Sequence, residues 1–218
     1  MPEDKKITEV IKEFFKDKKE DLFFVQVGAS DGITDDYLYP VIKEDMRWRG
    51  LFIEPVAHMR QELKENHRGD TRFLYDDSAV SVTESTRNFY QIKRNFQIIQ
   101  ELPEWVGRVG SLSRKHFLRL IGKGNKKYTR VNLLPVTNLK SLFEGYNAHF
   151  KNVDLLCIDT EGEDYNVLRG INFKRSVPDM IIYAHTHLHK KKQKAIDLLT
   201  KFGYKIKEYD VDTVAIKK

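Results

Sequence analysis

The sequence predicts an α/β fold with a mostly parallel sheet and helices on both faces. Two observations carry this prediction. Short apolar runs that end in small or acidic residues alternate with amphipathic segments of helical spacing along most of the chain. Continuous apolar runs suit strands that are buried on both faces of a parallel sheet. Strand–helix alternation, with right-handed crossovers, is the pattern of such sheets. The 218 residues suit one domain with a sizeable core, so we expect a single domain over residues 1–218.

The first part of the chain is expected to hold an opening helix and three strands. Apolar residues from Ile7 to Phe15 recur at helical spacing, which predicts a helix within residues 1–20. The run Leu22–Val27 predicts the first strand, because it is mostly apolar and ends at Gly28. The same reasoning predicts further strands at 50–53 and 71–75, and helices at 35–43 and 56–66.

The alternation is interrupted between residues 85 and 128 and then resumes. This segment is aromatic and basic and too apolar for a linker, so we interpret 85–128 as an insertion packed over the edge of the sheet. Strands are predicted at 153–158 and 180–183, with helices starting at 165 and spanning 190–202. Gly203 suits the C-terminal end of the last helix. Residues 204–209 and 213–216 predict a terminal antiparallel hairpin.

Composition narrows the class of protein. Hydrophobic residues make up 40% and charged residues 32% of the chain, which is typical of a globular domain. No apolar run approaches the roughly 20 residues of a membrane helix, and the N-terminus does not resemble a signal peptide. We therefore expect a cytoplasmic protein without a transmembrane segment. Cys157, the single cysteine, lies in an apolar run, so we expect a buried structural thiol.

The formal net charge is +6, which favours an acidic partner such as nucleic acid, a phosphorylated substrate or an anionic membrane. Much of the excess is local. One basic cluster consists of Lys123, Lys126, Lys127 and Arg130, and a second of Lys190, Lys191, Lys192 and Lys194. A solvated helix face explains the second cluster equally well.

Three predicted strands end in residues suited to ligand binding. The first is followed by a turn of small and polar residues, Gly28, Ala29, Ser30, Asp31 and Gly32. Small residues let a ligand approach the backbone closely, and ligands of open α/β sheets bind at the carboxyl ends of strands. The turn lacks the spaced triple glycine of dinucleotide-binding enzymes, which counts against NAD.

Acidic residues follow the other two strands. Glu54 lies roughly 20 residues past the glycine turn, where it can accept hydrogen bonds from both hydroxyls of a ribose. The alternative is a surface glutamate. Asp159 and Glu161 leave a buried strand at the same crevice, and burying an acid without a partner is costly, which argues for a purpose. Because the two residues alternate, they need not point the same way, and one could contact the ligand while the other holds a loop. The alternative is that they cap the next helix.

These segments, taken in order, resemble the FkbM family of S-adenosylmethionine-dependent methyltransferases. The similar segments are Val25–Gly32, Trp48–Pro55, Asp77–Val80, Val136–Leu139, Asp154–Gly162, Pro178–Tyr183 and Gly203–Tyr204. The run Ile158-Asp-Thr-Glu-Gly162 is the most specific of them. The resemblance implies a Rossmann-like class I methyltransferase fold with a seven-stranded sheet. It also implies O-methylation of a sugar, glycan or glycolipid hydroxyl, with S-adenosylhomocysteine as the second product.

The resemblance also assigns roles to residues. It places Gly28 to Gly32 under the methionine part of S-adenosylmethionine and Glu54 on its ribose. It places Asp77 and Ser78 beside the adenine, and Asp159, Thr160 and Glu161 at the methyl-transfer end. Related sequences often have a glutamate before the histidine that follows the fifth motif strand, where this chain has Ala184 before His185. If that glutamate is a base or a ligand in relatives, this chain has a weakened site, uses another group in place of the glutamate, or is an engineered variant.

A neutral hydroxyl is a poor nucleophile, so a general base should contribute about 10²- to 10⁴-fold. His185 is the first candidate because imidazole titrates near neutral pH, and Asp159 is the second. Alternating His185, His187 and His189 also suit part of a metal site. A divalent ion such as Mg²⁺ at Asp159 is the less favoured alternative to metal-free catalysis.

The insertion is expected to bind the acceptor as a lid through Trp105, Arg108, Arg114, His116 and Arg119. Arginine can hold phosphate or carboxylate with two hydrogen bonds, and aromatic faces suit sugars or bases. The alternative is an ordinary packed subdomain. Two other functions stay open: a nucleic-acid methyltransferase, which lacks a dedicated RNA-binding motif here, and a catalytically silent module that binds the cofactor.

Overall fold

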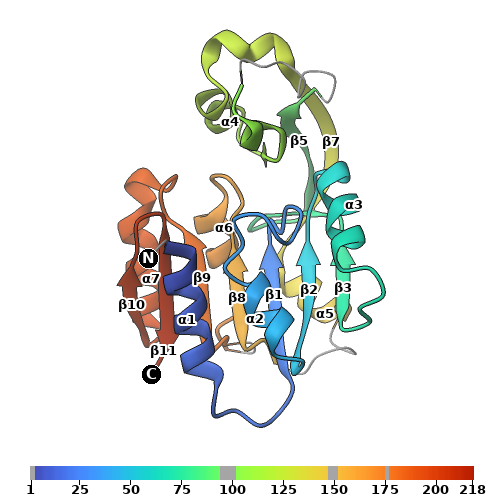
Figure 1. Cartoon of the computed structure of the whole chain (residues 1–218). Helices are drawn as coiled ribbons and strands as arrows, with labels where there is room; N and C mark the ends of the chain where they lie inside the picture. Colours follow the sequence, from blue (N-terminus) through green and yellow to red (C-terminus); the bar gives the residue numbers. More distant parts are fainter. Residues whose placement is uncertain (1–2, 94–101, 147–151, 175–176) are drawn as a thin grey trace.

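A computed structural model describes residues 3–93, 102–146, 152–174 and 177–218 and contains a seven-stranded sheet in the order β10-β11-β9-β8-β1-β2-β3 (Figure 1). Its strands are β1 (Leu22–Val27), β2 (Trp48–Ile53), β3 (Phe73–Asp76), β8 (Leu155–Ile158), β9 (Met180–Ala184), β10 (Tyr204–Glu208) and β11 (Asp212–Lys217). Five strands pair in parallel, whereas β11 is antiparallel to both β9 and β10. The mostly parallel sheet with a terminal antiparallel hairpin is therefore confirmed.

Three helices cover each face of this sheet (Figure 1). One face carries α1 (Glu3–Phe15), α2 (Tyr39–Glu44) and α3 (Ala57–Asn66), and the other carries α5 (Leu139–Tyr146), α6 (Asp164–Arg169) and α7 (Lys192–Lys201). Side chains of β1 alternate between the two resulting cores: Phe24 packs on the first face and Val25 on the second, and both are fully buried. A continuous apolar run is therefore needed in β1, as its sequence predicted.

Helix α2 begins later than predicted. Residues 35–38 form turns instead, because Asp35 has a φ of 56° and the carboxylate of Asp36 accepts a hydrogen bond from the backbone N–H of Leu38 at 2.7 Å. Pro40, near the start of the helix, has a fixed φ that suits this position. The 35–38 segment is thereby free to line the pocket described below.

The insertion forms a second sheet together with the preceding strand β4, in the order β4-β7-β5-β6. Its strands are β4 (Ala79–Val80), β5 (Ser85–Ile92), β6 (Gly110–Ser111) and β7 (Thr129–Thr137). Strands β5 and β7 pair along their length and carry α4 (Arg114–Leu120) beyond the carboxyl ends of the large sheet (Figure 1). The insertion thus extends to residue 137 and lies above the strand ends rather than over the sheet edge. Residues 94–101 of the predicted insertion lie outside the described residues.

The base of the insertion is packed against the α3 region, in the βαβ unit formed by β2, α3 and β3. Phe89 of β5 and Leu112 join Val56 and Met59 of the α3 region in one buried cluster. The remainder has its own small core, in which Phe117 of α4 is fully buried. The insertion is therefore fixed at one end and built around a separate core at the other.

Two expectations from composition can be compared with this fold. Cys157 is a free thiol buried in β8, as predicted. In the part of the chain that the structure describes, none of the helices combines the length and apolar character needed to cross a bilayer.

Candidate functional site

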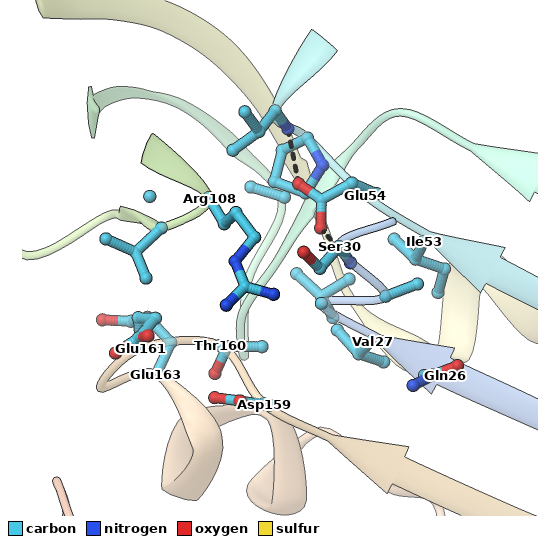
Figure 2. A pocket seen from close by; sticks show the side chains of 18 of the residues that line it. Gln26, Val27, Ser30, Ile53, Glu54, Arg108, Asp159, Thr160, Glu161 and Glu163 are labelled. Atoms are coloured by element: carbon cyan, nitrogen blue, oxygen red, sulfur yellow. Dashed lines mark hydrogen bonds between the residues drawn. The ribbon is translucent and has the colours of Figure 1, made fainter. Parts of the chain in front are cut away.

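A cavity of about 300 Å³ lies at the carboxyl ends of β1, β2 and β8, beneath the insertion (Figure 2). The three strand-end segments singled out in the sequence meet there. From these segments, the residues that line it include Gly28, Ala29, Ser30, Glu54, Asp159, Thr160 and Glu161. Ser78, Trp105 and Arg108 also line the cavity. The structure therefore brings residues from five separate parts of the chain into one pocket.

Gly28 is fixed by the close approach of two strand ends. The N–H of Asp159 donates to the carbonyl of Val27 at 2.8 Å, which brings β8 against the turn after β1. A Cβ atom at position 28 would lie 1.7 Å from the carbonyl oxygen of Asp159, and Gly28 has a φ of +81°. Both the space and the backbone conformation therefore require glycine. The absent side chain leaves the turn open to the pocket.

Glu54 is buried, with 4% of its surface exposed, and its two carboxylate oxygens are both occupied. One oxygen accepts from the N–H of Ser30 at 2.8 Å and the other from the N–H of Val56 at 2.7 Å (Figure 2). Burial raises the pKa of Glu54 to about 7, although both hydrogen bonds oppose the shift. The carboxylate is therefore held in place at the floor of the pocket with further lone pairs available to a ligand.

Asp159 and Glu161 form an acidic pair at the end of β8. Burial and repulsion from Glu161 raise the pKa of Asp159 to about 8, and burial raises that of Glu161 to about 7. Between them, the hydroxyl of Thr160 is buried and has no hydrogen-bond partner among the described residues. A buried polar group without a partner is costly, so this edge of the pocket suits a polar ligand.

Acidic side chains outnumber basic ones in the lining of the pocket. Its acidic residues are Asp35, Asp36, Glu54, Asp159, Glu161 and Glu163, whereas Arg108 is the one lysine or arginine among the described lining residues. The Arg108 side chain extends from the insertion into the pocket, and its guanidinium donates to Asp35 at 3.1 Å (Figure 2). An excess of carboxylates in a concave site favours a cationic ligand.

Three residues predicted to bind the cofactor lie elsewhere. The carboxylate of Asp31 accepts from the N–H of Thr34 at 2.8 Å and so stabilises the turn itself. Gly32 packs against α3, where a Cβ atom would lie 2.4 Å from Leu63. Asp77 has 71% of its side chain exposed. None of these three residues is among those that line the pocket, because the chain turns away from it after Ser30 and before Ser78, and their role in cofactor binding stays a prediction.

His185 also differs from its predicted position. Its Nδ1 lies 2.8 Å from the hydroxyl of Thr213 on β11, and its backbone N–H donates to the carbonyl of Val211. Strand β11 pairs with β9 up to Ala184, so the next residue turns toward β11. Among the described residues, the lining of the pocket includes Asp159 but not His185.

The five insertion residues expected to bind the acceptor separate into two groups and one outlier. Trp105 and Arg108 line the pocket. Arg114 and Arg119 lie with Lys115, Lys123 and Lys126 around another cavity. His116 turns inward, and its Nε2 lies 3.2 Å from Oε2 of Glu161.

Sequence reasoning missed two acidic residues that complete the site. Glu163 lines the pocket and accepts hydrogen bonds from Ser81 at 2.6 Å and Asn166 at 2.8 Å. Asp164 is fully buried and accepts from the N–H groups of Thr160 and Gly162, which fixes the loop after β8. The signal was available: these acids directly follow the Asp-Thr-Glu-Gly run at the start of a helix, where carboxylates are favourable.

Structural comparison supports the fold assignment. A methyltransferase FkbM structure from Methylobacillus flagellatus KT superposes with a TM-score of 0.53 at 13% identity, covering 91% of this chain and 44% of that one. This chain therefore spans less than half the length of that structure. A proposed rRNA methylase from Clostridium thermocellum gives a TM-score of 0.50 at 8% identity, covering 100% and 96%. The fold is the predicted Rossmann-like class I methyltransferase fold.

Sequence comparison identifies the family. Curated protein sequences gave no match. The family model described as the methyltransferase FkbM domain matches residues 26–206. That range contains every strand end that forms the pocket and the whole insertion. The chain therefore belongs to the FkbM methyltransferase family.

Proposed function

We propose that the protein transfers a methyl group from S-adenosylmethionine to a hydroxyl oxygen of a sugar, glycan or glycolipid. The observation that carries the proposal is the acid-lined pocket at the carboxyl ends of β1, β2 and β8 in a methyltransferase domain. S-adenosylmethionine carries a positive sulfonium, which such a pocket favours. When bound, it supplies an electrophilic methyl group, so the chain must position and deprotonate the acceptor.

The pocket residues fit this cofactor. Glu54 is fixed by two backbone N–H groups and can accept hydrogen bonds from ribose hydroxyls. The turn at Gly28 has no side chain between the backbone and the pocket. The unpartnered hydroxyl of Thr160 offers a further polar contact. Ser78 also lines the pocket, and we assign it to the adenine side.

We assign proton removal from the acceptor to Asp159. It lines the pocket, whereas His185 contacts Thr213. Burial and Glu161 raise the pKa of Asp159 to about 8, which lies near the range of an effective general base. The ionised carboxylate of Asp159 would accept the hydroxyl proton of the acceptor, whose oxygen would receive the methyl group that S-adenosylmethionine supplies when bound, with S-adenosylhomocysteine as the leaving group. His185 remains the alternative base.

The acceptor is expected to enter beside Trp105 and Arg108. Trp105 lines the pocket with 38% of its surface exposed, and an exposed aromatic face suits a sugar ring. The guanidinium of Arg108 can release Asp35 and pair with a carboxylate or phosphate on the acceptor. An anionic glycan is therefore the acceptor class that the insertion favours.

The test combines cofactor binding with methyl transfer. Calorimetry should show binding of S-adenosylmethionine, and Glu54→Ala should weaken it by about 1–3 kcal/mol, the scale of lost charged hydrogen bonds. Glu65→Ala, at an exposed position of α3, is the matched control. Methyl transfer is then followed by mass spectrometry over neutral and anionic glycans. Cofactor binding that is unaffected by Glu54→Ala in a folded protein would remove Glu54 from the site.

A nucleic-acid methyltransferase is the second candidate. The observation that favours it is the basic group around Arg114, Lys115, Arg119, Lys123 and Lys126 on the insertion. Phosphate contacts make affinity fall steeply as salt concentration rises. RNA binding with a steep salt slope, reduced by Lys123→Glu together with Lys126→Glu, would support this function over glycan methylation.

A catalytically weakened module is the third candidate. It is suggested by Ala184, which stands where related sequences often have a glutamate. Restoring the glutamate of related sequences with Ala184→Glu should raise turnover if its absence has weakened the site. Cofactor binding without turnover on any acceptor, in both the wild type and Ala184→Glu, would favour a binding module.

A further inference from the structure

Three side chains from separate parts of the chain converge beside the pocket. His116 comes from α4 of the insertion, Glu161 from the loop after β8, and His187 from the loop after β9. Nε2 of His116 lies 3.2 Å from Oε2 of Glu161, and Nε2 of His187 lies 3.5 Å from the same oxygen. One ligand atom from each side chain can be chosen so that all three lie within 4.8 Å of one another. Two imidazoles and one carboxylate therefore share a single small volume.

The spacing of these atoms suits a metal ion. Nitrogen and oxygen ligands lie about 2.0–2.2 Å from Zn²⁺, so two ligands at a tetrahedral angle are about 3.4 Å apart. The two distances to Oε2 of Glu161, 3.2 Å and 3.5 Å, bracket that value. Two histidines with one carboxylate are a ligand set of catalytic zinc and of non-haem iron sites. Mg²⁺ and Ca²⁺ prefer oxygen ligands, so this set favours a first-row transition metal instead.

Neighbouring residues hold Glu161 and His116 in place. The hydroxyl of Ser111 donates to the carbonyl of Glu161 at 2.8 Å, and Glu161 has a left-handed backbone with a φ of 51°. Gly162 leaves room for the imidazole of His116, because a Cβ atom there would lie 3.2 Å from its Cγ. Ser113 caps α4 by accepting from the N–H of His116. Ligands fixed in this way need little rearrangement to bind an ion.

The protonation state of the histidines agrees with this geometry. Burial lowers the pKa of His116 and of His187. Neutral imidazoles are the form that binds metals. Glu161 is mostly buried between the two histidines. Because buried carboxylates are usually paired or bound to metals, its position is also consistent with a metal site.

We propose that His116, Glu161 and His187 bind a divalent first-row transition-metal ion, such as Zn²⁺. Three protein ligands leave at least one coordination position open. Because Glu161 also lines the pocket, the ion would lie at the pocket and connect the insertion to the large sheet. An acceptor hydroxyl could use the open position, an extension that rests on the proposed function.

The site is tested by titrating the metal-free protein with Zn²⁺ and with Co²⁺, without S-adenosylmethionine or acceptor. We expect one ion per chain, with binding weakened at least about tenfold by His116→Ala and by His187→Ala, because losing a ligand should cost no less than losing a residue that only orients a ligand. His189→Ala is the matched control, since His189 lies in the same loop but contacts Arg119 instead. Its affinity should equal that of the wild type.

A second measurement separates ligand loss from misfolding. Zn²⁺ should raise the thermal unfolding midpoint of the wild type and of His189→Ala but not of His187→Ala. His187 has 29% of its side chain exposed, so removing its ring leaves the cores intact, and the urea midpoint of the metal-free variant checks this. Absence of saturable binding in the wild type would overturn the proposal. So would full affinity in the double variant His116→Ala/His187→Ala. Because neither measurement uses the cofactor, failure here is distinct from failure of methyl transfer.

Discussion

Glu54 is a buried carboxyl group whose ionisation should make the stability of this protein depend on pH. The informative substitution is Glu54→Gln, because a neutral amide resembles the protonated carboxyl in size and charge. In the wild type, both carboxylate oxygens accept backbone hydrogen bonds, from Ser30 and from Val56. The amide keeps one acceptor oxygen, so one N–H group loses its partner at all pH values.

The magnitude follows from the pKa. Burial raises the pKa of Glu54 from 4.5 to about 7, and each whole pKa step is worth about 1.4 kcal/mol. Protonated Glu54 therefore contributes about 3 kcal/mol to the free energy of unfolding. This contribution is fully present below pH 4.5 and is lost as the pH rises through about 7. Glu54→Gln has no such titration, so its stability relative to the wild type should increase by about 3 kcal/mol over that range.

The assay is urea denaturation of both proteins between pH 4.5 and 8, in the absence of cofactor, followed by circular dichroism. The other buried acids are present in both chains, so the difference between the two free energies reports the ionisation of Glu54 together with its charge repulsion of Asp159. Glu65→Gln, on the exposed side of α3, should run parallel to the wild type at every pH. A difference between Glu54→Gln and the wild type that stays constant with pH would refute the reasoning.

Three further predictions concern the pocket. Gly28→Ala should destabilise the fold by about 3 kcal/mol or more in urea denaturation, because the new Cβ atom would collide with the carbonyl oxygen of Asp159. The control Gly69→Ala should cost only about 1–2 kcal/mol, because Gly69 has a similar φ of +84° but no atom close to the position of the new Cβ. Asp159→Asn should lower kcat by about 10²-fold or more while His185→Ala lowers it less than tenfold, and the reverse order would make His185 the base. Arg108→Ala should raise the KM of an anionic acceptor about tenfold, whereas weaker cofactor binding with an unchanged KM would assign Arg108 to the cofactor.

The large sheet could be predicted because each of its strands is recognisable from a short stretch of sequence. Strands such as β1 and β8 are buried on both faces, so each is a continuous apolar run that the sequence shows directly. The insertion could not be predicted in the same way. Strand β7 has exposed apolar residues, with Leu133 68% exposed, so it has neither a continuous run nor a clear core-facing alternation. Its pairing with β5 joins residues far apart in sequence, which no local pattern encodes.

In the candidate site, too, the residues that local sequence patterns identify differ from those that depend on contacts between distant segments. Glu54 and Asp159 could be identified because each directly follows an apolar strand, and the parallel order of β2, β1 and β8 brings their ends together. His185 also follows a strand, yet its orientation depends on β11, which is formed by the end of the chain. The contact of His116 with Glu161 depends on how the insertion folds back over the sheet, and the sequence around either residue contains no sign of it.

The insertion leaves and rejoins the chain at neighbouring points. Ser85, where β5 begins, pairs with Val136 near the end of β7, and β4 pairs with that same end. A segment whose two attachment points are adjacent can be replaced or resized during evolution without moving the strands on either side. Because Gly28 and Glu54 lie outside this segment, chimaeras that exchange residues 85–137 between relatives should inherit acceptor choice from one parent and cofactor affinity from the other. Directed evolution of new acceptor specificity can therefore be confined to this segment of the chain.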